Sequence, residues 1–219
     1  MAPRRRRRDG RLIFVTGSRG SGKSGWTRQA VGERQRLLVW DAVKEWSRDG
    51  LVRPVRSLTD LHQLIITDIQ SPGLFRYGYV GPVTKKAFVT FCKLATVWMK
   101  AAPEGCVVVE ELADVTHAGK APEGWGELVR EGRHYSGDIY ALTQRPAESD
   151  KTVAGNCDLI HAGRQSFPRD RKTMAEYLDV PVEEVTALES LHWIERDMRD
   201  RRLSRGVLAF GRTRQRSQR

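Results

Sequence analysis

Cysteine is scarce in this chain of 219 residues, and no segment of it stays apolar for long. The three cysteines, Cys92, Cys106 and Cys157, form no CxxC pair, and the five histidines lack HxH or HxxxH spacing. The sequence therefore favours neither a disulfide framework nor a metal site built from thiolates or imidazoles. No run approaches the roughly 18 apolar residues that a membrane helix requires, and the apolar stretch 12–15 is too short for a signal peptide. These absences predict a cytosolic protein with reduced thiols and no integral membrane span.

Positive charge is concentrated at the two ends of the chain, whose formal net charge is +11. The N-terminal run consists of Arg4, Arg5, Arg6, Arg7 and Arg8. Residues 196–219 hold nine arginines and two aspartates, a contribution of +7, which leaves −1 for residues 9–195. Basic tails bind polyanions by releasing condensed counterions, which makes double-stranded DNA the leading partner. A solvated arm, a localisation signal or an anionic membrane surface remain alternatives.

Short apolar runs alternate with amphipathic stretches along the body of the chain. The expected strands are 12–15, 37–40, 51–55, 74–80, 106–109, 138–142 and 159–162, and the expected helices are 22–33, 58–69, 84–100, 124–134 and 169–178. Residues 193–195 and 206–210 are expected to add a C-terminal β-hairpin. This alternation predicts an α/β fold in one domain, with a mostly parallel sheet and helices on both faces.

A glycine-rich motif connects the first expected strand to the first expected helix. Residues 17–24, GSRGSGKS, fit GxxxxGK[ST] at every required position. In such a loop the backbone N–H groups hold a polyphosphate, the lysine contacts the β and γ phosphates, and the last hydroxyl binds Mg²⁺. Lys23 and Ser24 are expected to play these two parts. The expected nucleotide-binding residues are Gly17, Ser18, Arg19, Gly20, Ser21, Gly22, Lys23, Ser24 and Gly25.

Two adjacent carboxylates follow a buried-type strand in the middle of the chain. Val107, Val108 and Val109 run directly into Glu110 and Glu111. This pattern is typical of a Walker B strand, in which the first acid supports the Mg²⁺ shell and the second polarises the attacking water. Glu110 is therefore predicted to serve the metal and Glu111 to act as general base. Capping of the next helix is the alternative.

The second half of the chain carries a more specific pattern. Residues 130–133, REGR, precede the strand 138–142, which is followed by residues 143–146, TQRP. With the two preceding motifs, this pattern resembles the FtsK/HerA superfamily of DNA-pumping ATPases. It is most similar to the short genome-packaging ATPases of tectiviruses and related membrane-containing viruses, over residues 12 to about 164. The resemblance implies a P-loop NTPase fold (RecA/FtsK-HerA-like) at 11–195, between a basic N-terminal arm at 1–10 and an arginine-rich C-terminal segment at 196–219.

The resemblance also implies roles for residues beyond the phosphate loop. Gln144 is the expected polar sensor for the γ-phosphate or the attacking water. Arg133 and Arg130 are expected to reach the nucleotide of a neighbouring subunit, and Arg145 is a third candidate for that role. Aspartate is commoner than glutamate at the position of Glu110 in this superfamily. The implied cofactors are ATP and Mg²⁺.

Three functions are compatible with these patterns. The first is an ATPase that forms a homo-oligomeric ring, expected to be a hexamer, and pumps double-stranded viral DNA into a preformed capsid. Its partners would be DNA and the capsid portal or vertex proteins, in the host cytoplasm and the virion. The second is a phage extrusion ATPase of the zonula-occludens-toxin-like type, and the third is a basic DNA-binding structural protein with a degenerate nucleotide site.

Overall fold

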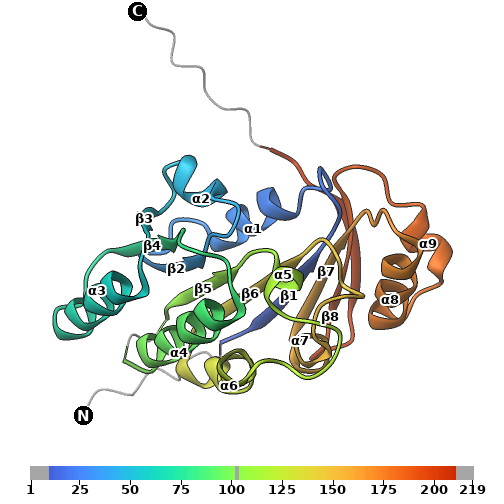
Figure 1. Cartoon of the computed structure of the whole chain (residues 1–219). Helices are drawn as coiled ribbons and strands as arrows, with labels where there is room; N and C mark the ends of the chain where they lie inside the picture. The colour runs from blue at the N-terminus through green and yellow to red at the C-terminus, as the bar shows by residue number, and fades with distance from the viewer. Residues whose placement is uncertain (1–9, 102–103, 211–219) are drawn as a thin grey trace, which may run out of the picture.

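The computed structural model describes residues 10–101 and 104–210, with Arg133 described through its backbone only (Figure 1). The predicted arm Arg4–Arg8 lies outside the described residues. Of the described helices, none is both long and apolar enough to cross a membrane. The predicted fold is confirmed: the protein is an α/β structure with a mostly parallel sheet and an antiparallel hairpin at its C-terminal end.

The described residues form a nine-stranded sheet in the order β3-β4-β2-β5-β6-β1-β7-β8-β9. Its strands are β1 Leu12–Thr16, β2 Arg36–Trp40, β3 Arg53–Val55, β4 Phe75–Tyr79, β5 Cys106–Val109, β6 Asp138–Thr143, β7 Leu159–Gly163, β8 His192–Asp197 and β9 Leu203–Val207. The strands from β3 to β7 in this order are parallel, whereas β8 and β9 are antiparallel. Parallel pairing brings the carboxyl ends of β2, β5, β6, β1 and β7 to one edge, where ligands of such sheets bind.

Helices connect the strands and cover the sheet. They are α1 Lys23–Val31, α2 Glu45–Arg48, α3 Leu58–Gln70, α4 Lys85–Ala101, α5 Leu112–Val115, α6 Glu123–Glu131, the 3₁₀ helix η1 Gly132–Tyr135, α7 Lys151–Asn156, α8 Pro168–Leu178 and α9 Val182–Thr186. Helix α3 begins as expected after Ser57, whose hydroxyl accepts a hydrogen bond from the Asp60 N–H.

The two faces of the sheet are covered unequally. One face packs against α3, α4, α6 and α8 in the larger apolar cluster, which includes Phe14, Trp40 and Trp98. The other face packs against α1 and the short α2, through Val31 and Trp46. Figure 1 shows the same division, with α1 and α2 on the side of the sheet opposite α4 and α6. The phosphate loop enters α1, so the site lies beside the thinly covered face.

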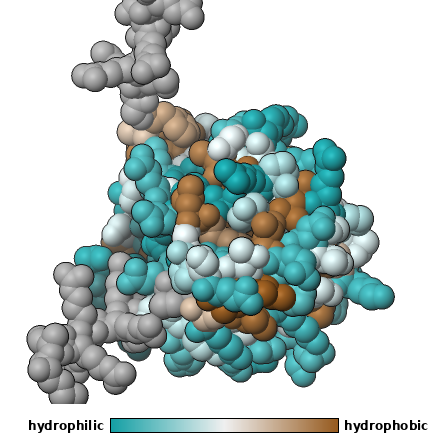
Figure 2. All heavy atoms as spheres, turned by 90° about the vertical axis from the view of Figure 1, so that its left-hand side faces the viewer, coloured by the Kyte–Doolittle hydropathy of each residue, from teal (hydrophilic) through white to brown (hydrophobic). Residues whose placement is uncertain are grey.

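Strand β3 ends the sheet on one side. It has three residues, and its central Pro54 has no N–H to donate. A short edge strand that contains proline is a poor template for pairing with another chain. Figure 2 views the molecule from this side and shows separate hydrophobic clusters surrounded by hydrophilic side chains.

Several predicted boundaries differ from the structure. The strand expected at 51–55 begins at Arg53, because Leu51 donates its N–H to the carbonyl of Trp46 in α2 and not to a neighbouring strand. The helix expected at 124–134 ends at Glu131 and continues as η1. The second hairpin strand, expected at 206–210, lies three residues earlier, at Leu203–Val207. Helices α2, α5, α7 and α9 were not predicted.

The predicted domain boundary at 195/196 falls inside β8, so the first part of the arginine-rich segment belongs to the folded sheet. Arg196 lies in β8, and its guanidinium donates to the Leu178 carbonyl at 2.6 Å. Arg199 pairs with Asp158 at 2.8 Å, and Arg205 pairs with Glu184 at 2.5 Å. These three arginines hold the hairpin against its neighbours, so their charges are not a free basic tail.

Candidate active site

The phosphate loop lies where β1 ends. Gly20 and Gly22 adopt positive φ angles of 77° and 95°, a conformation that glycine takes without strain. The loop is anchored by its neighbours, because the Ser18 N–H donates to the Arg164 carbonyl at 2.8 Å and the Ser190 hydroxyl donates to the Gly20 carbonyl at 2.9 Å. Helix α1 then begins at Lys23, which places the helix N-terminus at the loop, as anion binding requires.

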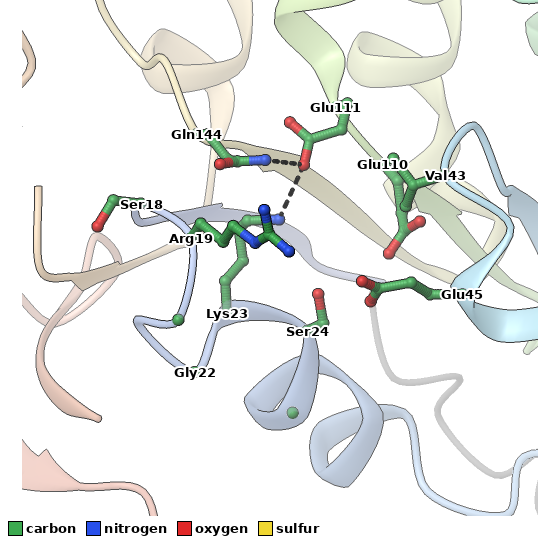
Figure 3. A pocket seen from close by; sticks show the side chains of 12 residues that line it. Ser18, Arg19, Gly22, Lys23, Ser24, Val43, Glu45, Glu110, Glu111 and Gln144 are labelled. Atoms are coloured by element: carbon green, nitrogen blue, oxygen red, sulfur yellow. Dashed lines mark hydrogen bonds and ion pairs between the residues drawn. The ribbon is translucent and has the colours of Figure 1, made fainter. Parts of the chain in front are cut away.

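A pocket of about 450 Å³ opens at this loop (Figure 3). Its lining residues come from the phosphate loop and the first turn of α1, from the segment between β2 and the start of α2, and from the positions that follow β5 and β6: Ser18, Arg19, Gly20, Gly22, Lys23, Ser24, Gly25, Val43, Glu45, Glu110, Glu111 and Gln144. Two of the nine expected nucleotide-binding residues, Gly17 and Ser21, are not among them. The Ser21 hydroxyl is buried and has no hydrogen-bond partner among the described residues. Val43 and Glu45 were not predicted.

Three predicted catalytic side chains meet in this pocket. The Gln144 amide donates to Glu111 Oε1 at 2.7 Å, and the Lys23 ammonium lies 3.4 Å from the same oxygen. Figure 3 shows both contacts converging on Glu111 above the loop. Strand β6 makes this possible because it pairs with β5 on one side and with β1 on the other. The sheet thus places Gln144, which follows β6, between Glu111, which follows β5, and the phosphate loop, which follows β1.

Glu111 does not cap the following helix with its side chain. Its backbone lies in the left-handed region, with φ 48° and ψ 54°, at the first position before α5. The side chain makes no capping hydrogen bond to α5 and instead contacts Lys23 and Gln144. The capping alternative therefore fails for Glu111.

Glu110 lies in a drier environment than Glu111. It is fully buried, and its Oε1 accepts a hydrogen bond of 2.9 Å from the Trp46 indole. Burial raises the pKa of Glu110 to about 7, although Lys23 and the Trp46 indole act in the opposite direction. Its Oε2 has no hydrogen-bond partner among the described residues. Ser24 lines the same pocket with its hydroxyl toward the two glutamates Glu110 and Glu45 (Figure 3).

The orphaned Glu110 Oε2 and the Ser24 hydroxyl fit a Mg²⁺ ion that is also held by phosphate oxygens, since hard oxygen donors are what this ion binds. Within the described residues, no three His, Cys, Asp or Glu side chains form a metal site. A Mg²⁺ ion here would depend on the nucleotide for its remaining ligands.

Asp41 positions this acidic side of the pocket and was not predicted as a site residue. It follows β2 and is fully buried. Its carboxylate accepts from the Ser47 N–H at 2.9 Å, the Ser47 hydroxyl at 2.7 Å and the Trp46 N–H at 3.3 Å. Asp41 thereby fixes the start of α2 and, through it, the indole that holds Glu110. The signal in the sequence is its place directly after an apolar strand, as for Glu110.

The chain is 34% identical to protein P9 of Pseudoalteromonas phage PM2 over 179 residues, which cover 81% of this chain and 79% of that protein. The chain belongs to the family of phage PM2 protein P9. No protein-family model matches it.

Solved structures agree with the fold of this P9-family chain. It is similar to the genome packaging NTPase B204 from Sulfolobus turreted icosahedral virus 2 in complex with AMPPCP, with a TM-score of 0.70 and 18% identity over 90% of this chain and 96% of that chain. VirB4 of Thermoanaerobacter pseudethanolicus gives a TM-score of 0.63 and 8% identity over 91% and 90% of the two chains. The resemblance is confirmed at the level of the fold: these neighbours are P-loop ATPases, and the P9-family chain has the fold of a P-loop NTPase.

The three candidate arginines of this P9-family chain lie in different places. Arg145 makes its contacts within the same chain, where its guanidinium pairs with Asp170 at 2.9 Å and with Glu148, and lies over the Phe167 ring. Arg130 is exposed near the end of α6, and the backbone of Arg133 lies in η1. Both elements directly precede β6, so these two arginines lie near the edge where β6 begins and not near the pocket.

Proposed function

We propose that the chain is an ATP-driven motor that packages double-stranded viral DNA into a preformed capsid. The observation that carries the proposal is the contact of Lys23 and Gln144 with one oxygen of Glu111 inside the phosphate-loop pocket. Membership of the P9 family and the likeness to B204, described as a genome packaging NTPase, support the packaging role.

Each part of the pocket has a role in the proposed hydrolysis. Loop N–H groups and Lys23 bind the β and γ phosphates, and Lys23 turns its donors from Glu111 to phosphate oxygens when the nucleotide enters. Glu111 then accepts a proton from the attacking water, while the Gln144 amide fixes the orientation of its carboxylate. When bound at Ser24 and Glu110, Mg²⁺ supplies positive charge beside the transferred phosphoryl group.

A ring completes the site in this proposal. Arg133 and Arg130 lie near the edge opposite the pocket, so they can serve the nucleotide of a neighbouring subunit but not that of their own. We infer a homo-oligomeric ring, expected to be a hexamer, that acts at the packaging vertex between the host cytoplasm and the virion. Arg4–Arg8 and the last arginines of the chain would face DNA or the portal proteins.

The test is the rate of ATP hydrolysis with Mg²⁺, with and without linear double-stranded DNA, at low and moderate salt. Lys23→Ala is the blank, and Lys86→Ala, which removes an exposed charge on α4, is the matched control for hydrolysis without DNA. We expect marked stimulation by duplex DNA that fades as salt rises. A hydrolysis rate that is the same with and without DNA would contradict the proposal of a DNA motor. Co-flotation with anionic vesicles would then favour the extrusion ATPase.

Removal of residues 1–9 tests the basic arm separately. Each neutralised phosphate contributes about 0.9 to the slope of log affinity against log salt, so loss of the five arginines Arg4–Arg8 is expected to reduce the magnitude of that slope by up to about 4.5. Hydrolysis without DNA is expected to stay unchanged. Loss of nucleotide binding in the truncated chain would show that the arm has another role.

A further inference from the structure

Phe210 is an exposed aromatic side chain beside the nucleotide pocket. It follows β9, and 59% of its surface is exposed to solvent. Neighbouring apolar residues of the same segment behave differently, because Leu208 is only 7% exposed and packs against the phosphate loop at Gly22. Core packing explains Leu208 but leaves the exposed ring of Phe210 unexplained.

The backbone around Phe210 is fixed against the phosphate loop and α1. The Gln29 amide on α1 donates to the Ala209 carbonyl at 2.8 Å, and the Leu208 N–H donates to the Leu191 carbonyl at 2.9 Å. These bonds attach the segment on both sides of Leu208. These two bonds fix the backbone that leads into Phe210 and so place this residue beside α1.

Gly25 allows this ring to approach the first turn of α1. A Cβ atom at Gly25 would lie 2.6 Å from Phe210 Cε1 and 2.9 Å from Cζ, well inside van der Waals contact. Gly25 also lines the nucleotide pocket. The Phe210 ring thus packs against Gly25, and Gly25 in turn lines the pocket.

The catalytic side chains fix the direction in which a nucleotide lies in the pocket. Glu111 and Gln144 mark the γ-phosphate end, and Lys23 serves the β and γ phosphates. The three phosphates of a nucleoside triphosphate are consecutive, so the nucleoside must leave the loop at the far end, past Ser24 and Gly25. Phe210 lies at this far end.

We propose that Phe210 is the base-binding residue of the site and that the purine ring of the bound nucleotide stacks on its exposed face. Every base has a π-face, so stacking on an aromatic ring tolerates different bases and is stronger for the larger purines. This inference rests on nucleotide binding at the phosphate loop and not on DNA packaging. In this proposal the segment after β9 binds the base, whereas the glycine-rich motif binds only the phosphates.

The test compares a ligand that has a base with one that lacks it. Binding of Mg²⁺–AMPPCP and of Mg²⁺–tripolyphosphate to the full chain is measured by calorimetry for the wild type, Phe210→Ala and Phe210→Trp. We expect Phe210→Ala to weaken AMPPCP binding by about tenfold and to leave tripolyphosphate binding unchanged. Phe210→Trp, which keeps an aromatic face, is expected to retain most of the AMPPCP affinity. Leu74→Ala, which removes an apolar side chain that is 72% exposed ahead of β4, is the matched control.

The two ligands separate the possible failures. Equal weakening of both ligands in Phe210→Ala would show that the ring supports the phosphate loop, and unchanged binding of both would show that it contacts no base. Either result overturns the proposal and leaves the DNA motor intact. Failure of the wild type to bind either ligand would overturn both the base site and the proposed ATPase.

Discussion

The parallel strands all end along one edge of the sheet and all begin along the opposite edge, and these two edges carry different side chains. At the edge where the strands end, Lys23, Glu111 and Gln144 converge in a pocket. At the edge where they begin, Asp138 is the first residue of β6 and pairs with Arg34. Helix α6, which contains Arg130, precedes this strand in the sequence. Strand β6 has six residues and spans about 20 Å, so the two sets cannot meet within one subunit. In the proposed ring, the edge where the strands end holds the nucleotide. The edge where they begin supplies the arginine that completes the nucleotide site of the neighbouring subunit.

Arg133→Ala is expected to have the largest effect on this division of roles. An arginine supplied in trans accounts for about 10³ to 10⁵ in kcat, so hydrolysis should fall by that factor while nucleotide affinity stays unchanged. Mixing Arg133→Ala subunits with Lys23→Ala subunits should restore part of the activity, measured as steady-state ATP hydrolysis. Arg169→Ala, an exposed arginine on α8, is the control. No recovery in the mixture would show that Arg133 has a structural role only.

Glu111→Gln tests the edge that holds the pocket. Loss of a general base costs about 10² to 10⁴ in rate, so single-turnover hydrolysis should fall by that factor. The neutral amide keeps the size of the side chain, and equilibrium binding of ATP should remain within a few-fold of the wild type. Glu123→Gln, at a residue whose side chain is 82% exposed, is the matched control. An active Glu111→Gln variant would remove Glu111 as the base.

Arg34→Met tests whether the edge where the strands begin contributes to stability without affecting the nucleotide pocket. The substitution leaves the largely buried Asp138 carboxylate with the Arg11 N–H at 2.9 Å as its remaining described hydrogen-bond donor. We expect the free energy of unfolding to fall by about 1–2 kcal/mol, measured by denaturant titration, with unchanged nucleotide affinity. Arg53→Met, at an exposed position on β3, is the control. Weaker nucleotide binding would show that the two edges are coupled.

The stability of the fold is expected to respond weakly to pH through His161, which lies in β7 beside β1. This side chain is buried in β7, stacks on Trp26 with ring centroids 4.1 Å apart, and bonds Glu195 at 2.8 Å. Burial lowers the pKa of His161 below its usual value of 6.5, although Glu195 acts in the opposite direction. The unfolded chain therefore binds more protons below about pH 6.5, and stability falls as pH falls, by at most about 1.4 kcal/mol per pH unit.

Denaturant titrations at pH 7.5 and pH 5.5 measure this effect. His161→Gln should lose the pH dependence that His161 contributes, whereas His62→Gln, at an exposed position on α3, should keep it. An unchanged pH profile in His161→Gln would contradict a neutral buried imidazole.

Most of the sheet could be predicted because its central strands are continuous apolar runs that end in chemically distinctive residues. β1 leads into the phosphate loop, β5 into Glu110 and Glu111, and β6 into Gln144. The contacts among these side chains could not be predicted in the same way. They depend on the lateral order of the strands, which places β6 between β5 and β1.

The missed features have local physical reasons. The apolar run at 207–210 suggested a strand, but Leu208 leaves the sheet and packs on Gly22, while Val207 is 57% exposed. Helix α2 has four residues, too few for a helical period, and its function appears only through the bond from Trp46 to Glu110. Helix α7 did carry a signal, because Asp150 caps it by accepting from the Thr152 and Val153 N–H groups.

The contact between the Ser190 hydroxyl and the Gly20 carbonyl joins residues 170 positions apart. During synthesis, the ribosome releases the phosphate loop long before it releases the hairpin that packs on it. The glycine-rich loop of a growing chain therefore lacks Ser190, Leu191 and Leu208, and its final shape forms only after these residues have been synthesised. Nucleotide binding should therefore mature as a late step in the folding of this domain, after the hairpin has packed on the loop.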